Sequence, residues 1–303
     1  MSELFNLFIN NLLPIILAAG AGYLLSILMD IDPRPISRLV FYIFSPCLIF
    51  TLLTESELSN GDILRTMSFA VILIAVIGTI TWLAGSLMKL KRTVLAGVLL
   101  GSMFINAGNY GLPVVLFAFG ENALSFASVF FVISAMLAFT MGVIIASMGS
   151  VSLGQALVNL LKIPSLYALL LALFFMYTGL QIPLPVDRTV TLLGDAAIPG
   201  MLILLGLQLR SISWVGQSKP IALAAVMRLV GGPIVALMLG RAFGLVGASR
   251  QAIVLQSAMP TAVLATVLST EYETEPSLVT AIVFVTTLLS PFTLTPLLAY
   301  LGA

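Results

Sequence analysis

Two apolar stretches of this sequence are each interrupted by residues that break an α-helix and carry polar groups. The first interruption is Asn106-Ala-Gly-Asn-Tyr-Gly-Leu-Pro113, and the second is Gln256-Ser-Ala-Met-Pro-Thr261. Glycine loosens a helix and proline removes a backbone donor, so each interruption leaves N–H and C=O groups unpaired where water is absent. Corresponding interruptions in the two halves of a chain are typical of a binding site near the middle of a membrane.

The composition indicates that the chain lies in lipid. Apolar residues make up 60% of the sequence, charged residues make up 8%, and the mean hydropathy is +1.17. Soluble proteins have roughly 45–50% apolar and 25% charged residues. At about 20 residues per span, the chain has room for roughly ten transmembrane helices. The predicted spans are 7–29, 35–54, 63–88, 93–119, 122–147, 161–179, 189–209, 219–240, 249–270 and 277–301.

Lysine and arginine residues are unevenly distributed between the predicted connections. Orientation follows the placement of these residues in short loops, with the richer side facing the cytoplasm. The bias predicts a multi-pass protein of the cytoplasmic (inner) membrane with both termini outside. The predicted inner side contains Arg34, Arg38, Lys89, Lys91, Arg92, Lys162, Arg210 and Lys219, and the outer side contains Arg65, Arg188, Arg241 and Arg250.

The second half of the chain is a weak echo of the first. Pro14 aligns with Pro164, and Pro46 of the second span aligns with Pro199 of the seventh. An odd number of spans per repeat forces the two halves to insert in opposite orientations. The fold class that we predict is an all-α polytopic membrane protein with two inverted five-helix repeats, at 1–148 and 149–303.

Three groups of residues together resemble the auxin efflux carrier family, which includes plant pin-formed carriers and bacterial relatives suggested to move malonate and similar organic acids. The likeness covers nearly the whole chain. The groups are Asn106-Ala-Gly-Asn-Tyr-Gly-Leu-Pro113, Ala197-Ile-Pro199 followed by Leu204-Leu-Gly-Leu-Gln208, and Ser257-Ala-Met-Pro-Thr-Ala262.

The resemblance implies a ten-helix fold similar to that of the bile acid/sodium symporters. It implies a scaffold of spans 1, 2, 6 and 7 and a transport core of spans 3–5 and 8–10, in which the broken helices 4 and 9 cross. Elevator-type movement and homodimers are expected from the same resemblance. The asparagine motif lacks the proline of the plant carriers and the central loop is short, which indicates a bacterial-type carrier.

The two interruptions also predict the chemistry of the site. A half-helix N-terminus carries roughly +0.5 of an elementary charge and free N–H donors, so a carboxylate fits where two of them meet. The Asn106 and Asn109 amides and the Thr261 hydroxyl would add donors. The alternative is that these side chains only satisfy the broken backbone. The expected substrate-binding residues are Ser45, Asn106, Gly108, Asn109, Tyr110, Gly111, Pro113, Gln256, Met259, Pro260 and Thr261.

Two charged residues lie well inside predicted spans, at a cost of about 2.5–3.5 kcal/mol each on insertion scales. Arg228 could attract an anionic substrate, or it could snorkel or pair with a backbone carbonyl at a helix break. Asp195 could be a protonatable coupling group, or it could be solvated near the outer end of its span. Both are candidate coupling or charge-compensating residues.

The residue inventory excludes several enzyme classes. The chain has no histidine and one cysteine, so a zinc-dependent intramembrane protease and a Ser/His dyad are ruled out. We therefore expect no enzyme activity, cofactor, metal or nucleic acid, and a lipid bilayer as the surroundings. The prediction is a secondary active transporter of small organic anions, such as malonate, malate or auxin-like acids, with H+ and Na+ both open as coupling ions. The alternative is a membrane-embedded ligand sensor that uses the same pocket without transport.

Overall fold

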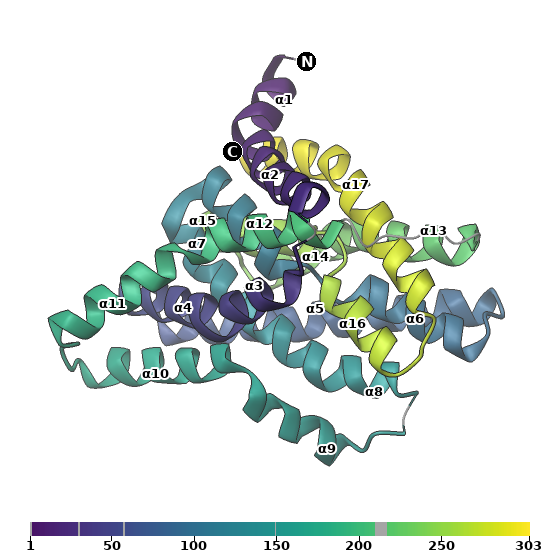
Figure 1. Ribbon diagram of the computed structural model, residues 1–303, viewed down its shortest axis with the longest axis horizontal. Helices are drawn as coiled ribbons and strands as arrows, with labels where there is room; N and C mark the ends of the chain where they lie inside the picture. Colours follow the sequence, from purple (N-terminus) through teal and green to yellow (C-terminus); the bar gives the residue numbers. More distant parts are fainter. Residues whose placement is uncertain (1, 30, 57, 149, 210–216) are drawn as a thin grey trace.

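The computed structural model describes residues 2–29, 31–56, 58–148, 150–209 and 217–303, and these residues are almost entirely helical (Figure 1). Arg210, which the charge argument assigns to the inner side, lies outside the described residues. The first-half segments are α1 (Ser2–Leu7), η1 (Phe8–Leu12), α2 (Leu13–Met29), α3 (Pro33–Leu39), η2 (Val40–Phe44), α4 (Ser45–Thr54), α5 (Asn60–Leu87), α6 (Arg92–Met103), η3 (Ala107–Gly111), α7 (Leu112–Leu137), η4 (Ala138–Gly142) and α8 (Val143–Ala146).

The second half is helical in the same way. Its segments are α9 (Leu153–Val158), η5 (Asn159–Lys162), α10 (Pro164–Thr178), α11 (Leu184–Asp195), α12 (Ala197–Leu209), α13 (Ser218–Val226), η6 (Met227–Gly231), α14 (Gly232–Ala242), α15 (Gly247–Ser257), α16 (Val263–Glu271) and α17 (Pro276–Leu301). The region 148–160, which we expected to be a linker, therefore contains the short helix α9.

Seven helical stretches among the described residues are long and apolar enough to cross a membrane. One of them, Ala107–Ala146, spans 40 residues and covers parts of two predicted spans. Gly120 lies inside it with φ 76° and ψ −169°, a conformation that is not helical and that glycine adopts without a steric penalty. The fourth and fifth predicted spans therefore meet at Gly120 without an intervening loop.

Most of the widened helical turns come directly before a proline. The π-turns η1, η2, η3 and η6 each end two residues before one, at Pro14, Pro46, Pro113 and Pro233. A proline ring clashes with the carbonyl four residues earlier, and a π-turn moves that carbonyl away. The prolines thus bend these spans without ending them.

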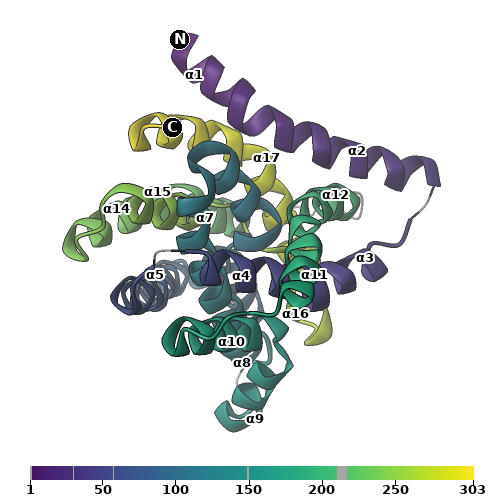
Figure 2. The ribbon, with the colours of Figure 1, turned by 90° about the vertical axis from the view of Figure 1, so that its left-hand side faces the viewer.

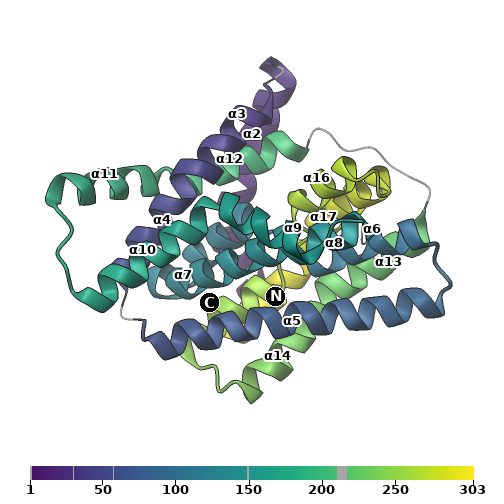
Figure 3. The same ribbon diagram turned by 90° about the horizontal axis from the view of Figure 1, so that it is seen from below.

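The helices pack in two groups. In one group, α2 packs against α12, and α4 packs against α10 and α11. In the other, α5 to α7 pack with α13 to α17. Figure 2 shows α2 and α12 on the side opposite α5 and α14, and Figure 3 shows α10 and α11 together at one end of the molecule.

Two glycines allow α2 and α12 to touch backbone to backbone. A Cβ atom on Gly22 would lie 2.2 Å from the carbonyl oxygen of Ile203, and one on Gly206 would lie 1.8 Å from that of Ala19. Neither position has room for any side chain, because the obstructing atoms belong to the backbone. The close contact expected from the small residues of the first span is thus made within the chain.

Candidate functional site

The two interruptions lie next to each other and are joined by backbone hydrogen bonds. The N–H of Asn106 donates to the carbonyl of Pro260 at 2.8 Å, and the N–H of Ala262 donates to the carbonyl of Phe104 at 2.9 Å. Between them, Ile105 and Thr261 form an antiparallel β-bridge. Each break therefore supplies the partners that the other break lacks.

Side chains from the second break and from α17 hold this crossing in place. The Thr261 hydroxyl donates to the carbonyl of Gly101 at 2.6 Å, and the Thr261 N–H donates to the Thr286 hydroxyl at 3.1 Å. The Gln256 amide donates to the carbonyl of Ala107 at 3.1 Å. Both Thr261 and Gln256 are fully buried, so these bonds form out of contact with solvent.

Arg228 joins the C-terminal ends of the two helices that lead into the breaks. Its Nη1 donates to the carbonyl of Ser102 in the last turn of α6 at 2.8 Å, and its Nη2 donates to the carbonyl of Ser257 at the end of α15. Its side chain is 1% exposed. A helix C-terminus carries roughly −0.5 of an elementary charge, so one guanidinium offsets both ends. This is the carbonyl pairing that the sequence left open as an alternative to a substrate role.

The N-terminal ends of the two helices that leave the breaks face a cavity of about 310 Å³. Neither η3 nor α16 has a side-chain cap, so first-turn N–H groups remain available at both ends. The cavity is lined by Ser37, Arg38, Val40, Phe41, Tyr42, Ser45, Phe104, Ile105, Asn106, Gly108, Asn109, Phe131, Ser134, Ala135, Ala138, Phe139, Leu204, Gln208, Ala262, Val263, Leu264 and Val267.

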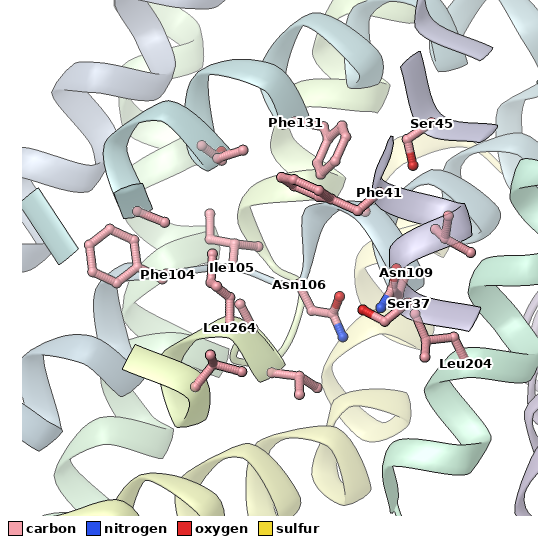
Figure 4. Close-up of a pocket in the computed structure, with 18 of the residues that line it drawn as sticks. Ser37, Phe41, Ser45, Phe104, Ile105, Asn106, Asn109, Phe131, Leu204 and Leu264 are labelled. Atoms are coloured by element: carbon pink, nitrogen blue, oxygen red, sulfur yellow. The ribbon is translucent and has the colours of Figure 1, made fainter. Parts of the chain in front are cut away.

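The polar groups of the cavity gather beside the first break. Figure 4 shows the amides of Asn106 and Asn109 together with the Ser37 side chain, on the other side of the cavity from the rings of Phe41 and Phe131. Asn106 is 6% exposed, and its Nδ2 has no hydrogen-bond partner among the described residues. A buried donor without a partner is costly, so this amide is suited to a ligand that accepts a hydrogen bond.

An aromatic wall faces these amides. The rings of Phe41 in η2 and Phe139 in η4 lie 5.9 Å apart between centroids and are tilted by 46°. Phe131 is close to the first break, because a Cβ atom on Gly108 would lie 2.8 Å from its ring. The cavity thus combines hydrogen-bond donors at one end with an apolar body, an arrangement common in small-molecule sites.

The predicted site residues divide into two sets. Ser45, Asn106, Gly108 and Asn109 line the cavity. The remaining members are buried in the crossing or behind it and do not line this cavity; they are Tyr110, Gly111, Pro113, Gln256, Met259, Pro260 and Thr261.

Tyr110 borders a second cavity. This cavity has a volume of about 370 Å³ and lies between α2, α12 and α17. The Ser290 hydroxyl donates to the Tyr110 hydroxyl at 3.2 Å, within a lining that is otherwise largely apolar. Tyr110 therefore follows Asn109 in sequence but borders a different space.

The two charged candidates lie apart from the first cavity. Arg228 is at the crossing, and Asp195 is exposed at the C-terminal end of α11. Neither lines the cavity.

Several lining residues were not predicted as site residues from the sequence. Ser37 and Arg38 come from α3, where Arg38 entered only as a marker of orientation, and Phe131, Ser134 and Phe139 come from the span after the first break. Their positions follow from how the helices pack. A helical run rich in phenylalanine gives no sign of which ring faces a cavity.

Comparison with known proteins agrees with this geometry. A family model described as "Membrane transport protein" matches residues 7–298. An uncharacterized transporter of Methanocaldococcus jannaschii is 27% identical over 286 residues, covering 91% of this chain and 92% of the relative. An uncharacterized transporter of Methanothermobacter thermautotrophicus is 28% identical over 288 residues, covering 92% and 94%.

The match spans nearly the whole chain, including both breaks and the helices that line the cavity. The chain therefore belongs to the membrane transport protein family, which is the auxin efflux carrier family that its motifs resemble.

Proposed function

We propose that this membrane transporter is a secondary active carrier of small organic anions, in particular carboxylates such as malonate, malate or auxin-like acids. The observation that carries the proposal is the unpartnered, buried Nδ2 of Asn106 beside two uncapped helix N-termini at one cavity. A carboxylate accepts several hydrogen bonds at once and carries the charge that helix N-termini favour.

The electrostatics of the crossing support an anion over a cation. Arg228 offsets the partial negative charge of both helix C-termini. The two N-termini have no acidic residue in their first turns. Their partial positive charges thus act on the cavity without opposition from nearby carboxylates.

An elevator-type movement fits the two packing groups. We propose that α1 to α4 and α10 to α12 form the scaffold and that α5 to α8 and α13 to α17 form the transport core. Both groups line the cavity, with Phe41 and Leu204 from the scaffold and Asn106 and Val263 from the core. A substrate bound between them is carried across when the core slides.

The proposed topology has two inverted five-helix repeats, a location in the cytoplasmic membrane and both termini outside. The reciprocal hydrogen bonds of the two breaks, in which each strand donates once and accepts once, suit a two-fold relation between the repeats. A homodimer is proposed on the family resemblance.

The test is uptake of radiolabelled malonate, malate and indole-3-acetate into proteoliposomes under imposed pH, sodium and voltage gradients. Asn106→Ala and Asn109→Ala remove the cavity amides, and Asn122→Ala removes an exposed amide outside the cavity as the matched control. Saturable uptake that the first two variants lose and the control retains supports the proposal.

Two results argue against it. If an acid binds the purified protein and never crosses under any gradient, the chain acts as a sensor. If all three variants transport alike, the cavity is not the site.

The coupling role of Asp195 is tested separately by Asp195→Asn. If this carboxyl carries the coupling proton, the substitution abolishes the pH dependence of transport. An unchanged pH profile assigns coupling to another group.

A further inference from the structure

Arg38 is the one charged side chain among the described residues that line the first cavity. It lies in α3 and is exposed, and no described residue forms a hydrogen bond or an ion pair with its guanidinium. The guanidinium offers five N–H donors in a fork that matches a carboxylate. A charged donor without a protein partner at an anion cavity is available to the ligand.

The position of Arg38 relative to the break gives this charge a direction. Its neighbour Ser37 faces Asn109 across the cavity (Figure 4). Ser37 and Arg38 belong to the proposed scaffold, while Asn106 and Asn109 belong to the proposed core. The two sets of donors therefore lie on parts that move relative to each other in an elevator cycle.

The same helix offers an internal comparison. Arg34 lies one turn before Arg38 on α3 and is also exposed, but it does not line the cavity. A general electrostatic effect of the loop, or attraction to lipid headgroups, involves both arginines. A role in the cavity involves Arg38 alone.

We propose that Arg38 is a side-specific anion-binding residue, which strengthens substrate binding when the cavity is open on the α3 side and has no contact with substrate when it is open on the other side. This inference rests on the proposed function. When the core moves away from α3, the break carries its own donors with it and leaves Arg38 behind. Affinity on the α3 side then includes a charge-assisted hydrogen bond that affinity on the far side lacks.

The inference separates two measurable quantities. The Michaelis constant on the α3 side depends on Arg38, because that residue contacts the bound anion there. The final accumulation under a fixed gradient does not, because a carrier cannot change the driving force. A variant that alters the first quantity and leaves the second unchanged has lost a binding contact on one side only.

The experiment measures uptake in right-side-out and in everted membrane vesicles that contain the full chain. The probe is whichever of radiolabelled malonate, malate and indole-3-acetate the unaltered protein transports best. The variants are Arg38→Gln, Arg38→Lys and Arg34→Gln, and protease access to a C-terminal tag checks that each inserts with the same orientation.

The expected result is a Michaelis constant raised about tenfold by Arg38→Gln in one vesicle orientation, the size expected for one charge-assisted hydrogen bond. The other orientation is expected to stay within experimental error. Arg38→Lys recovers part of the loss, because it keeps the charge and loses the planar fork. Arg34→Gln leaves both orientations unchanged.

Three outcomes overturn the inference. Equal changes in both orientations mean that Arg38 acts on the fold or on the whole cycle. Equal effects of Arg34→Gln and Arg38→Gln mean that both residues act through the lipid surface. No change in any variant means that the guanidinium faces away from the substrate. If the unaltered protein transports none of the acids, the proposed function fails, and this inference fails with it.

Discussion

The Nη1 atom of Arg228 lies 2.8 Å from the carbonyl oxygen of Ser102, deep inside the protein. The other terminal nitrogen of the same guanidinium donates to Ser257, more than 150 residues away from Ser102 in sequence. Gly232 leaves the space for this side chain, since a Cβ there would lie 2.4 Å from Nη2. One residue thus ties the ends of two broken helices together.

Replacing Arg228 with methionine is therefore expected to destabilise the crossing. Arg228→Met keeps a long side chain and leaves the carbonyls of Ser102 and Ser257 without a donor, at about 1–3 kcal/mol for each buried group. A lower thermal midpoint in detergent and a large loss of uptake are expected. Arg241→Met, at an exposed arginine of α14, is the control. An Arg228→Met protein that is as stable as the control would show that water can replace the guanidinium.

Gly111 is expected to tolerate no side chain. A Cβ atom there would lie 2.2 Å from Oε1 of Gln256, whose amide is held by its bond to the carbonyl of Ala107. Gly111→Ala should cost about 1–3 kcal/mol through overpacking, and it should lower uptake by displacing the crossing. Gly20→Ala is the control, because a Cβ on Gly20 has no atom within 4 Å. Thermal unfolding of both variants checks this, and equal midpoints contradict the geometry.

A negative charge at the first break should stop anion transport without removing a hydrogen bond from the fold. Asn106→Asp replaces a nitrogen that has no protein partner with an oxygen that repels a carboxylate. Uptake at neutral pH is expected to fall more than about tenfold and to recover in part as acid neutralises the introduced carboxyl. Asn122→Asp, on the surface, controls for the added charge. Retained uptake at neutral pH in Asn106→Asp would place the anion elsewhere.

The acidic residues at the far end of α4 predict a pH effect on stability. Burial raises the pKa of the Glu55 carboxyl, and the negative charges of Asp187, Glu121 and Asp195 raise it further. A carboxyl whose pKa is higher in the folded state contributes stability at low pH, and this contribution is lost as the pH rises through the folded-state pKa. Glu55→Gln should thus raise the thermal midpoint slightly at neutral pH.

The gain from Glu55→Gln is expected to be small, because Glu55 is exposed and solvent screens its charge. It should vanish below about pH 4, where both proteins are neutral at this position. Thermal unfolding across this pH range measures it. A gain that persists in acid would show that the substitution acts through packing.

The breaks themselves could be read from the sequence. Gly108, Gly111 and Pro113 in the first break and Pro260 in the second mark the places where α-helical hydrogen bonding stops. These residue types act locally, through their own backbone, so their effect does not depend on the rest of the fold.

The partners of the polar side chains could not be read in the same way. Thr261 and Gln256 were expected to bind substrate, and the structure directs their side-chain donors to backbone carbonyls. Asn106 has the same kind of side chain, yet its Nδ2 has no protein partner. The difference depends on which backbone groups lie nearby after the two breaks have crossed, and this is a long-range property.

The contribution of α3 to the cavity was also beyond the sequence. Ser37 and Arg38 lie outside both breaks and carry no motif, and a basic residue near a span end is ordinary in membrane proteins. Their place at the cavity comes from the packing of α3 against α12, which brings the start of the second span beside the first break.

The reciprocal bonds between the breaks also constrain how the protein is made. Asn106 N–H donates to Pro260, and Ala262 N–H donates to Phe104. When the first half has entered the bilayer during synthesis, residue 260 has yet to leave the ribosome. The first break must then wait in lipid, with its backbone groups held by water or by an insertion chaperone, until the second half arrives. The two halves of this carrier are thus halves of a single folding event, and neither is expected to mature alone.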